Sequence, residues 1–208
     1  EYIHVEKPDR EAAPSRQFDI SKIDFELLSR EFAHTRRKNL LLRDLDELVN
    51  QQLAKMLFAN PQRIDYYDRY QEIIDAYNAE QNRATIEKTF MDLMELASSL
   101  DTEQQRYVRE GFSSDEELSV YDLLFSENLT KQEIETIKKV SVDLLTKIKQ
   151  QIAKLDHWTD KQETKAIVDN LIRNTLWQEL PNSYDVSDIQ TYQKKIYEYV
   201  YMRYPEVA

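Results

Sequence analysis

The sequence predicts an all-α fold, an elongated bundle of about seven or eight helices. Only one glycine occurs among the 208 residues, so few backbone positions can adopt a positive φ without strain. Apolar residues recur at spacings of three and four along most of the chain, and no stretch alternates for long enough to indicate a strand. With 41% hydrophobic and 32% charged residues, the composition is typical of helices with one narrow apolar face.

The first 17 residues lack this periodicity. They hold two of the five prolines, Pro8 and Pro14, and we interpret residues 1–17 as a linker from an upstream module. The chain begins Glu-Tyr-Ile-His, without an initiator Met or an apolar signal segment, so we expect a piece of a longer polypeptide. Residues 18–208 are then expected to form the helical domain.

Helices are predicted in close succession over the first half of this domain. A short helix covers the apolar positions near 23–28, and a longer one begins near residue 39 and ends at Asn60-Pro61. Asparagine is a favoured cap and proline a favoured first helical residue, so this pair also starts the next helix. Apolar and aromatic residues then mark helices over 64–77 and 86–100.

Gly111 is predicted to end a helix. It follows a helical run with Arg106 and Arg109 in its last turns, where a left-handed cap favours glycine. Ser114 and Glu117 have the spacing of a capping box. The chain should therefore leave one helix at Gly111 and begin another at Ser114.

The C-terminal part predicts three more helices. Thr130 and Glu133 have the spacing of a second capping box, ahead of an apolar stripe that reaches Leu155. Helices over about 160–178 and 187–203 follow, separated by a turn that begins at Pro181.

The chain is acidic, with 28 basic and 39 acidic residues and a net charge of -11. Such a chain is repelled by phosphate backbones unless its basic residues cluster. Only residues 128–165 are weakly basic, with eight basic and six acidic side chains, and this change of charge suggests two lobes, about 18–127 and 128–208. The absence of cysteine excludes disulfides and thiolate nucleophiles and suits the cytoplasm. No apolar run is long enough to span a membrane.

The residues predict no catalytic, cofactor-binding or metal site. A single glycine excludes the common glycine-rich nucleotide-binding fingerprints. Glu31 and His34 have the Glu-x-x-His spacing of carboxylate-bridged di-metal bundles, but such a site needs the pair twice. The other match, Glu1 with His4, lies in the linker, so a solvated His34 is the better interpretation.

A second catalytic alternative is a nuclease centre. Asp160, Glu163 and Lys165 have the order of carboxylates and lysine found in many restriction nucleases. Nuclease carboxylates are held on strands, however, whereas these lie in the first turns of a predicted helix, where acidic residues complement the helix dipole.

Lysines between residues 130 and 165 are the candidates for contact with DNA. They are interleaved with acidic residues, which favours ordinary solvation over a phosphate-binding surface. The candidate residues are Lys138, Lys139, Lys147, Lys149 and Lys154.

Aromatic residues near the C-terminus are the candidates for a protein interface. The last predicted helix carries rings on more than one face, so it must either lie centrally in the bundle or bind a partner. Core packing is the alternative for each residue taken alone, but large aromatics are enriched at interfaces. The candidates are Trp158, Trp177, Tyr192, Tyr197 and Tyr201.

Three stretches together resemble a known family. They are the run from Arg36 to Asn78, which contains Asn-Pro-Gln-Arg-Ile-Asp-Tyr-Tyr, the run Glu116–Phe125 (EELSVYDLLF), and the run Trp158–Trp177. These resemble the C-terminal helical region of the restriction (R, motor) subunit of type I restriction-modification enzymes. The resemblance covers roughly residues 18–208.

The resemblance implies a parent polypeptide with a nuclease domain and two helicase-like ATPase lobes that pump duplex DNA. It implies that this region packs on those motor domains and attaches the R subunit to the methyltransferase core of modification and specificity subunits. ATP and Mg²⁺ belong to the other modules, so no cofactor and no catalytic residue is expected here, and contact with DNA is expected to be indirect. The alternatives are a duplex DNA clamp formed by the Lys-rich helices of 130–165 and, less favoured, a di-metal helical enzyme.

Overall fold

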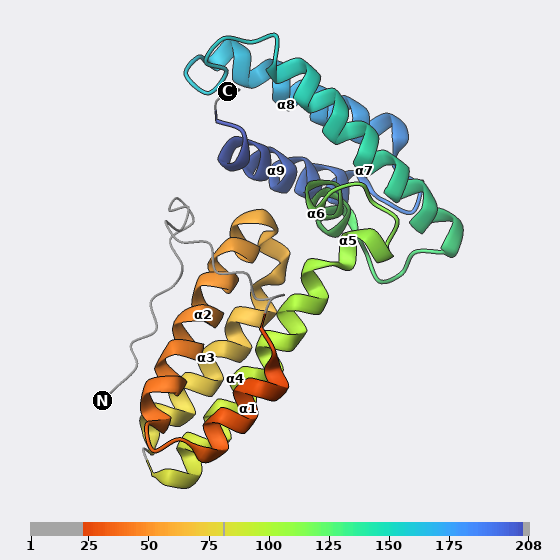
Figure 1. The fold of residues 1–208 in the computed structure, drawn as a ribbon. Helices are drawn as coiled ribbons and strands as arrows, with labels where there is room; N and C mark the ends of the chain where they lie inside the picture. Colours follow the sequence, from red (N-terminus) through yellow and green to blue (C-terminus); the bar gives the residue numbers. More distant parts are fainter. Residues whose placement is uncertain (1–22, 81, 206–208) are drawn as a thin grey trace. The chain divides into compact units, whose positions relative to one another are not determined.

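The computed structural model describes residues 23–80 and 82–205, in which helices are joined by short loops (Figure 1). These ranges contain nine α-helices, one 3-10 helix and no strand, which confirms the all-α prediction. The helix beyond the expected seven or eight is α5, Arg106–Arg109, a single turn that the apolar spacing does not separate from the run before it. Within the same ranges no helix is both long and apolar enough to cross a membrane.

The chain divides into two compact units, Glu1–Arg106 and Tyr107–Ala208. The change of charge predicts a boundary near residue 127, so composition and packing divide the chain at different places. The physical reason is that α6 (Asp115–Leu124), which belongs to the acidic part of the sequence, packs on α7 (Lys131–Ile152) in the second unit.

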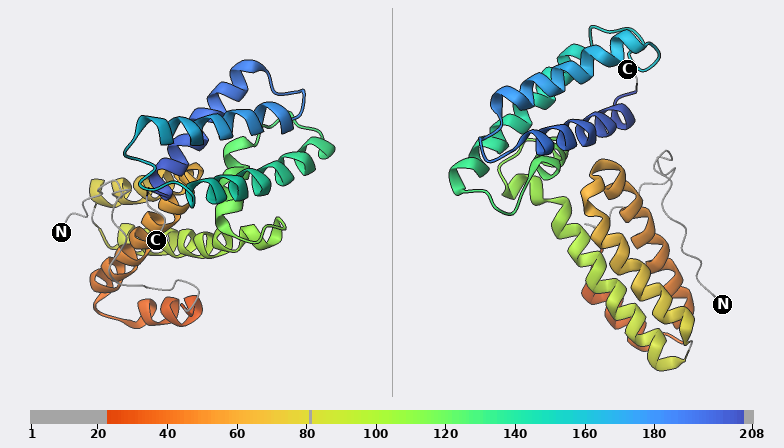
Figure 2. Two further views of the ribbon diagram at one scale, coloured as in Figure 1. Left: turned by 90° about the horizontal axis from the view of Figure 1, so that it is seen from above. Right: turned by 180° about the vertical axis from the view of Figure 1, so that it is seen from behind.

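The first unit is built around α4, Arg83–Gln104. This helix lies alongside both α2, Lys38–Ala59, and α3, Ile64–Ala79 (Figures 1 and 2). The apolar stripes of the three helices meet in a core whose fully buried members include Leu42, Leu53, Ile74, Phe90, Leu93 and Leu100. The shorter α1, Phe25–His34, joins this core through Phe32, whose ring stacks on that of Phe90.

Side-chain caps fix three of the helix starts in this unit, those of α1, α4 and the 3-10 helix before α3. Asp24 accepts a hydrogen bond from the backbone of Leu27 at the start of α1, and Asn82 accepts one from Thr85 at the start of α4. Asn60 caps the 3-10 helix η2, Pro61–Arg63, which leads into α3. The predicted Asn-Pro signal is thereby confirmed, with one 3-10 turn inserted before the α-helix.

Two buried polar pairs cross this core. The Tyr70 hydroxyl donates to a carboxylate oxygen of Asp46 at 2.7 Å, and Arg63 Nε donates to Glu103 Oε1 at 3.0 Å. Burial is the largest influence on Asp46 and raises the pKa of its carboxyl group, although the hydrogen bond from Tyr70 acts in the opposite direction.

The second unit contains α6, α7, α8 (Gln162–Glu179) and α9 (Val186–Arg203). Helix α7 packs on α6 and α8, and α9 packs on α8 and α6, so the four helices enclose one core (Figure 2). Its fully buried members include Leu118, Leu144, Ile148, Val168, Ile172 and Ile196.

Gly111 ends α5 as the sequence predicts. Its φ is +84°, and the Phe112 amide donates to the Tyr107 carbonyl across the turn. Thr130 and Glu133 form a full capping box at α7. Ser114 caps α6 through the Glu117 amide, but the Glu117 carboxylate accepts from the amide of Ser113 instead of Ser114.

We expect Gly111→Ala to destabilise the second unit by about 1–2 kcal/mol, the usual cost of a Cβ in the left-handed region. An added Cβ meets no heavy atom within 4 Å, so the cost comes from the backbone alone. Gly111→Asn should cost less, because asparagine tolerates this conformation. Urea unfolding followed by tryptophan fluorescence measures the effect, since Trp158 and Trp177 are the only two tryptophans. Equal stability of the alanine variant would contradict the assignment.

Asp46→Asn should change the pH dependence of the first unit. A carboxyl group whose pKa is raised on folding contributes less stability as the pH rises from its ordinary pKa, near 3.8, through the raised value. The asparagine variant lacks this loss and can still accept from Tyr70. The free energy of unfolding of the variant minus that of the natural chain should therefore be larger at pH 7 than at pH 4. Urea unfolding followed by circular dichroism measures this difference. Tryptophan fluorescence, which reports the second unit, should show no such difference.

Candidate functional site

Trp158 anchors the aromatic side chains at the end of α9. It is 1% exposed, and its indole Nε1 donates to the backbone carbonyl of Tyr204 at 2.6 Å. The rings of Tyr197 and Tyr201 meet it edge-on, with centroids 6.2 and 5.7 Å away. Edge-to-face contacts of this kind add to the gain from burial. We call these four residues the Trp158 cluster.

The connection between α7 and α8, residues 153–161, presents Trp158 to α9. His157 has a φ of +45°, so the chain turns sharply just before the tryptophan. The hydroxyl of Thr164 donates to the Trp158 carbonyl at 2.7 Å, and Thr159 donates to the carbonyl of Pro205 at 3.3 Å. The connection is thus tied both to the start of α8 and to the chain that follows α9.

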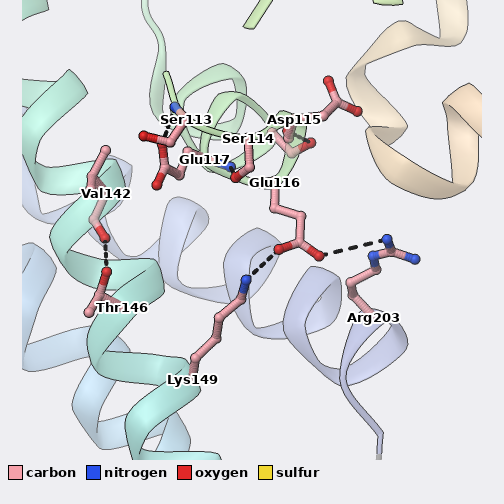
Figure 3. Close-up of polar contacts among 10 residues, drawn as sticks. Ser113, Ser114, Asp115, Glu116, Glu117, Val142, Thr146, Lys149 and Arg203 are labelled. Atoms are coloured by element: carbon pink, nitrogen blue, oxygen red, sulfur yellow. Dashed lines mark hydrogen bonds and ion pairs between the residues drawn. The ribbon is translucent and has the colours of Figure 1, made fainter. Parts of the chain in front are cut away.

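A second interaction, between charged groups, joins three helices beside this cluster. Glu116 of α6 lies between Lys149 of α7 and Arg203 of α9 (Figure 3). Its Oε2 accepts from the Lys149 ammonium, and its Oε1 lies 3.7 Å from the Arg203 guanidinium. Burial acts to raise the pKa of Glu116, but Lys149 and, to smaller extents, Tyr204 and then Arg203 outweigh it and lower that pKa.

Tyr204 links the charged group to the aromatic one. The Lys149 ammonium lies 5.4 Å from the centre of the Tyr204 ring, a cation–π contact. The neighbouring Tyr199 ring meets Tyr204 edge-on, and burial raises the pKa of Tyr199 to about 12. Both tyrosine hydroxyls stay protonated at neutral pH. The interacting charges here are therefore the Glu116 carboxylate, the Lys149 ammonium and the Arg203 guanidinium.

Exposed apolar side chains lie at both ends of the α8–α9 pair. At one end, Tyr201 and Met202 lie in the last turn of α9 and Ile167 lies near the start of α8. The Lys165 ammonium of α8 is 5.7 Å from the centre of the Tyr201 ring, which shows that these two helix ends are close together. At the other end, Trp177 near the end of α8 is 57% exposed and Val186 begins α9. Ile167 and Trp177 are ten residues apart, about 15 Å along a helix.

The five predicted interface aromatics do not form one patch. Trp158 is a core residue because the loop folds back onto α9 and covers it, and its role as a contact residue stays a prediction. Tyr197 and Tyr201 lie over it, with Tyr201 39% exposed. Tyr192 packs edge-on against Tyr184 at 5.5 Å, and Trp177 is separate from all of them on α8.

The predicted DNA-contacting lysines are largely occupied within the second unit. Lys138 pairs with Glu110 at 3.2 Å, Lys147 pairs with Asp143 and Glu179, and Lys149 pairs with Glu116. Lys139 and Lys154 are exposed, and among the described residues no carboxylate lies within ion-pair distance of either. The basic character of 128–165 is thus reduced by carboxylates from outside this segment, namely Glu110, Glu116 and Glu179.

The two catalytic alternatives have the following geometry. Glu31 and His34 are exposed on α1, and His34 Nδ1 lies 2.8 Å from the Arg30 carbonyl. In the described part of the chain, no three His, Asp or Glu side chains are grouped so as to hold a metal ion. The partners Glu1 and His4 lie outside the described residues. Asp160 is exposed before α8 and Glu163 lies in its first turn.

Comparison with known proteins identifies the family. A family model described as type I restriction enzyme HindI endonuclease subunit-like, C-terminal, matches residues 11–204. The chain belongs to this family. Neither a curated protein nor a solved structure matches it.

This type I restriction enzyme C-terminal domain contains site residues that the sequence pattern did not single out. Glu116 is one of many acidic side chains, and its importance comes from Lys149 and Arg203, which are 33 and 87 positions later in the chain. The position of Tyr204 after the last turn of α9 gives no sign that its carbonyl receives the Trp158 indole. Only the density of aromatics near the C-terminus points to this region.

We expect Glu116→Gln to destabilise the second unit of this domain by about 1 kcal/mol at pH 7, because it removes a charge-assisted hydrogen bond that is partly screened by solvent. A carboxyl group with a lowered pKa contributes stability above its ordinary value, near 4.5, and loses it as the pH falls through the lowered value. The difference from the natural chain should therefore shrink below pH 4. Urea unfolding followed by tryptophan fluorescence tests this, and a constant difference would contradict it.

Proposed function

We propose that this domain attaches the motor subunit of a type I restriction enzyme to the methyltransferase core of modification and specificity subunits. The family supports a role within such an enzyme. The observation that carries the proposal is the set of apolar side chains exposed at the two ends of the α8–α9 pair. Among the described residues, half of the ten large apolar side chains that are exposed belong to these two helices: Ile167, Trp177, Val186, Tyr201 and Met202.

The chemistry of these side chains suits a protein partner. Tryptophan, tyrosine and methionine are enriched at interface cores, and tryptophan and tyrosine dominate binding energies there. Scattered exposed leucines need no explanation, but a tryptophan that is 57% exposed on a helix of an otherwise hydrophilic chain does. Trp177 and Tyr201 are accordingly the proposed anchors, with Tyr197 and Tyr192 supporting the surface from within.

The mechanism would be geometric. Helices fixed to the methyltransferase core hold the motor in place, so that ATP-driven translocation moves DNA past a stationary anchor. The domain itself would be non-catalytic and would bind no cofactor, with ATP and Mg²⁺ bound by other modules of a cytoplasmic parent endonuclease. Its contact with DNA would be indirect.

Direct contact with duplex DNA through the lysines of 130–165 is the alternative. Lys139 and Lys154 favour it, since they are exposed without an ion-pair partner among the described residues. It is less well supported because Lys138, Lys147 and Lys149 already pair with carboxylates, and neutralised lysines release few counterions from DNA.

The proposal predicts that the chain is captured by assembled modification and specificity subunits, and that Trp177→Ala or Tyr201→Ala weakens capture at least tenfold, about 1.4 kcal/mol. Met91→Ala, at a position 56% exposed on α4, is the matched control and should bind normally. Undiminished capture of both aromatic variants would contradict the proposed surface. Steeply salt-dependent binding of duplex DNA without capture would favour the lysine alternative.

A further inference from the structure

The first unit contains an apolar groove that the proposed function does not use. Helices α1 and α2 form its two walls, and it has a volume of about 400 Å³. Six of its nine lining residues are leucine or isoleucine and the other three are acidic. No lysine or arginine lines it.

Each wall presents a helical stripe of its own. On α1, Leu27 faces the groove and is 61% exposed. On α2, Leu41 and Leu48 line it, two turns apart, and both remain partly exposed. Phe32 and Leu42 of the same helices point into the core instead. The groove therefore lies at the edge of the first unit's core: Leu45 belongs to that core, Leu28, Leu41 and Leu48 pack against it, and Leu27 remains exposed.

The groove has an acidic rim. Asp24, Glu31 and Asp44 are exposed at its edge. The Asp24 carboxylate caps α1 through the Leu27 amide, whereas within the described residues neither Glu31 nor Asp44 has a cationic side chain within ion-pair distance. Two of the basic side chains on α1 and α2 are engaged elsewhere, since Arg30 pairs with Glu26 and Lys38 with Glu87, while Arg43 is exposed next to Asp44 in the chain.

We propose that this groove binds a basic amphipathic helix of a partner protein. Leu41 to Leu48 spans about 10 Å of α2, so a helix of two to three turns would fill it with apolar residues at i, i+3 or i+4, and i+7. Lysine or arginine side chains flanking that stripe pair with Glu31 and Asp44. Charge complementarity selects this occupant over a second copy of the same chain, whose net charge is -11.

The first test uses a fluorescein-labelled helical peptide of 14 residues, with leucine at every third or fourth position and lysine elsewhere. A matched peptide carries glutamate in place of each lysine. Measured by fluorescence anisotropy with the whole 208-residue chain, the lysine peptide should bind at least tenfold more tightly than the glutamate peptide. Equal binding of the two peptides, or no binding of the lysine peptide, overturns the proposal.

Substitutions distinguish the groove from general attraction to an acidic protein. Leu27→Lys leaves the core intact because Leu27 is exposed. It should weaken the binding of the lysine peptide at least tenfold, whereas Met91→Lys on α4 should have little effect on that binding. Both variants change the net charge equally, so equal effects overturn the proposal. Circular dichroism of each variant checks that the helices remain folded.

Charge reversal tests the rim. The double variant Glu31→Lys, Asp44→Lys should bind the lysine peptide at least tenfold more weakly and should bind the glutamate peptide. The control, Glu72→Lys with Asp75→Lys, reverses two exposed carboxylates of α3 and should do neither. Concentration-dependent dimerisation of the chain that Leu27→Lys abolishes would assign the groove to a second copy and overturn the proposal. None of these variants alters the exposed side chains of α8 and α9, so failure here leaves the proposed function untouched.

Discussion

Both units must begin and end their helices with a single glycine in the whole chain. Six helices begin at a residue whose side chain accepts a backbone hydrogen bond: Asp24, Asn60, Asn82, Ser114, Thr130 and Asp185. Several helices end by turning directly into extended backbone, as at Thr35, Phe125 and Leu180, where the cap amide still donates to the carbonyl four residues back. Local sequence thus sets where most of these helices start, and thereby which apolar residues share a face.

The same locality explains which parts of the fold the sequence could predict. The Thr130–Glu133 box and the Gly111 cap act within four residues, so their spacing is visible in the chain. The pairs Tyr70 with Asp46 and Arg63 with Glu103 join residues 24 and 40 positions apart, and no short pattern marks them. The single turn of α5 and the 3-10 turn before α3 were missed because one turn leaves too few residues to show a period.

The candidate site was predictable as a region but not as a surface. A helix with rings on several faces must bury some of them, and composition alone does not say which. Trp158 is buried because a sharp turn at His157 folds the α7–α8 connection over α9, so that the indole finds the Tyr204 carbonyl. Trp177 lies on a regular helix whose inner face is already filled by Ile172 and Leu176. The lysines followed the same logic in part: the partners Glu110, Glu179 and Glu116 come from distant segments, whereas Asp143 is one turn from Lys147.

Charge therefore acts differently on the two surfaces of this domain. In the second unit, Glu110, Glu116 and Glu179 neutralise lysines internally, and α8 and α9 expose aromatic and aliphatic side chains among polar and charged ones. Association there depends on apolar burial, which salt scarcely weakens. In the groove of α1 and α2, carboxylates stay unneutralised at the edge of an apolar floor. Binding there combines burial with exposed ion pairs, which salt screens over about 8–10 Å. Added salt should thus weaken binding at the groove but scarcely affect binding at α8 and α9, which allows partners of the two units to be separated in one binding experiment.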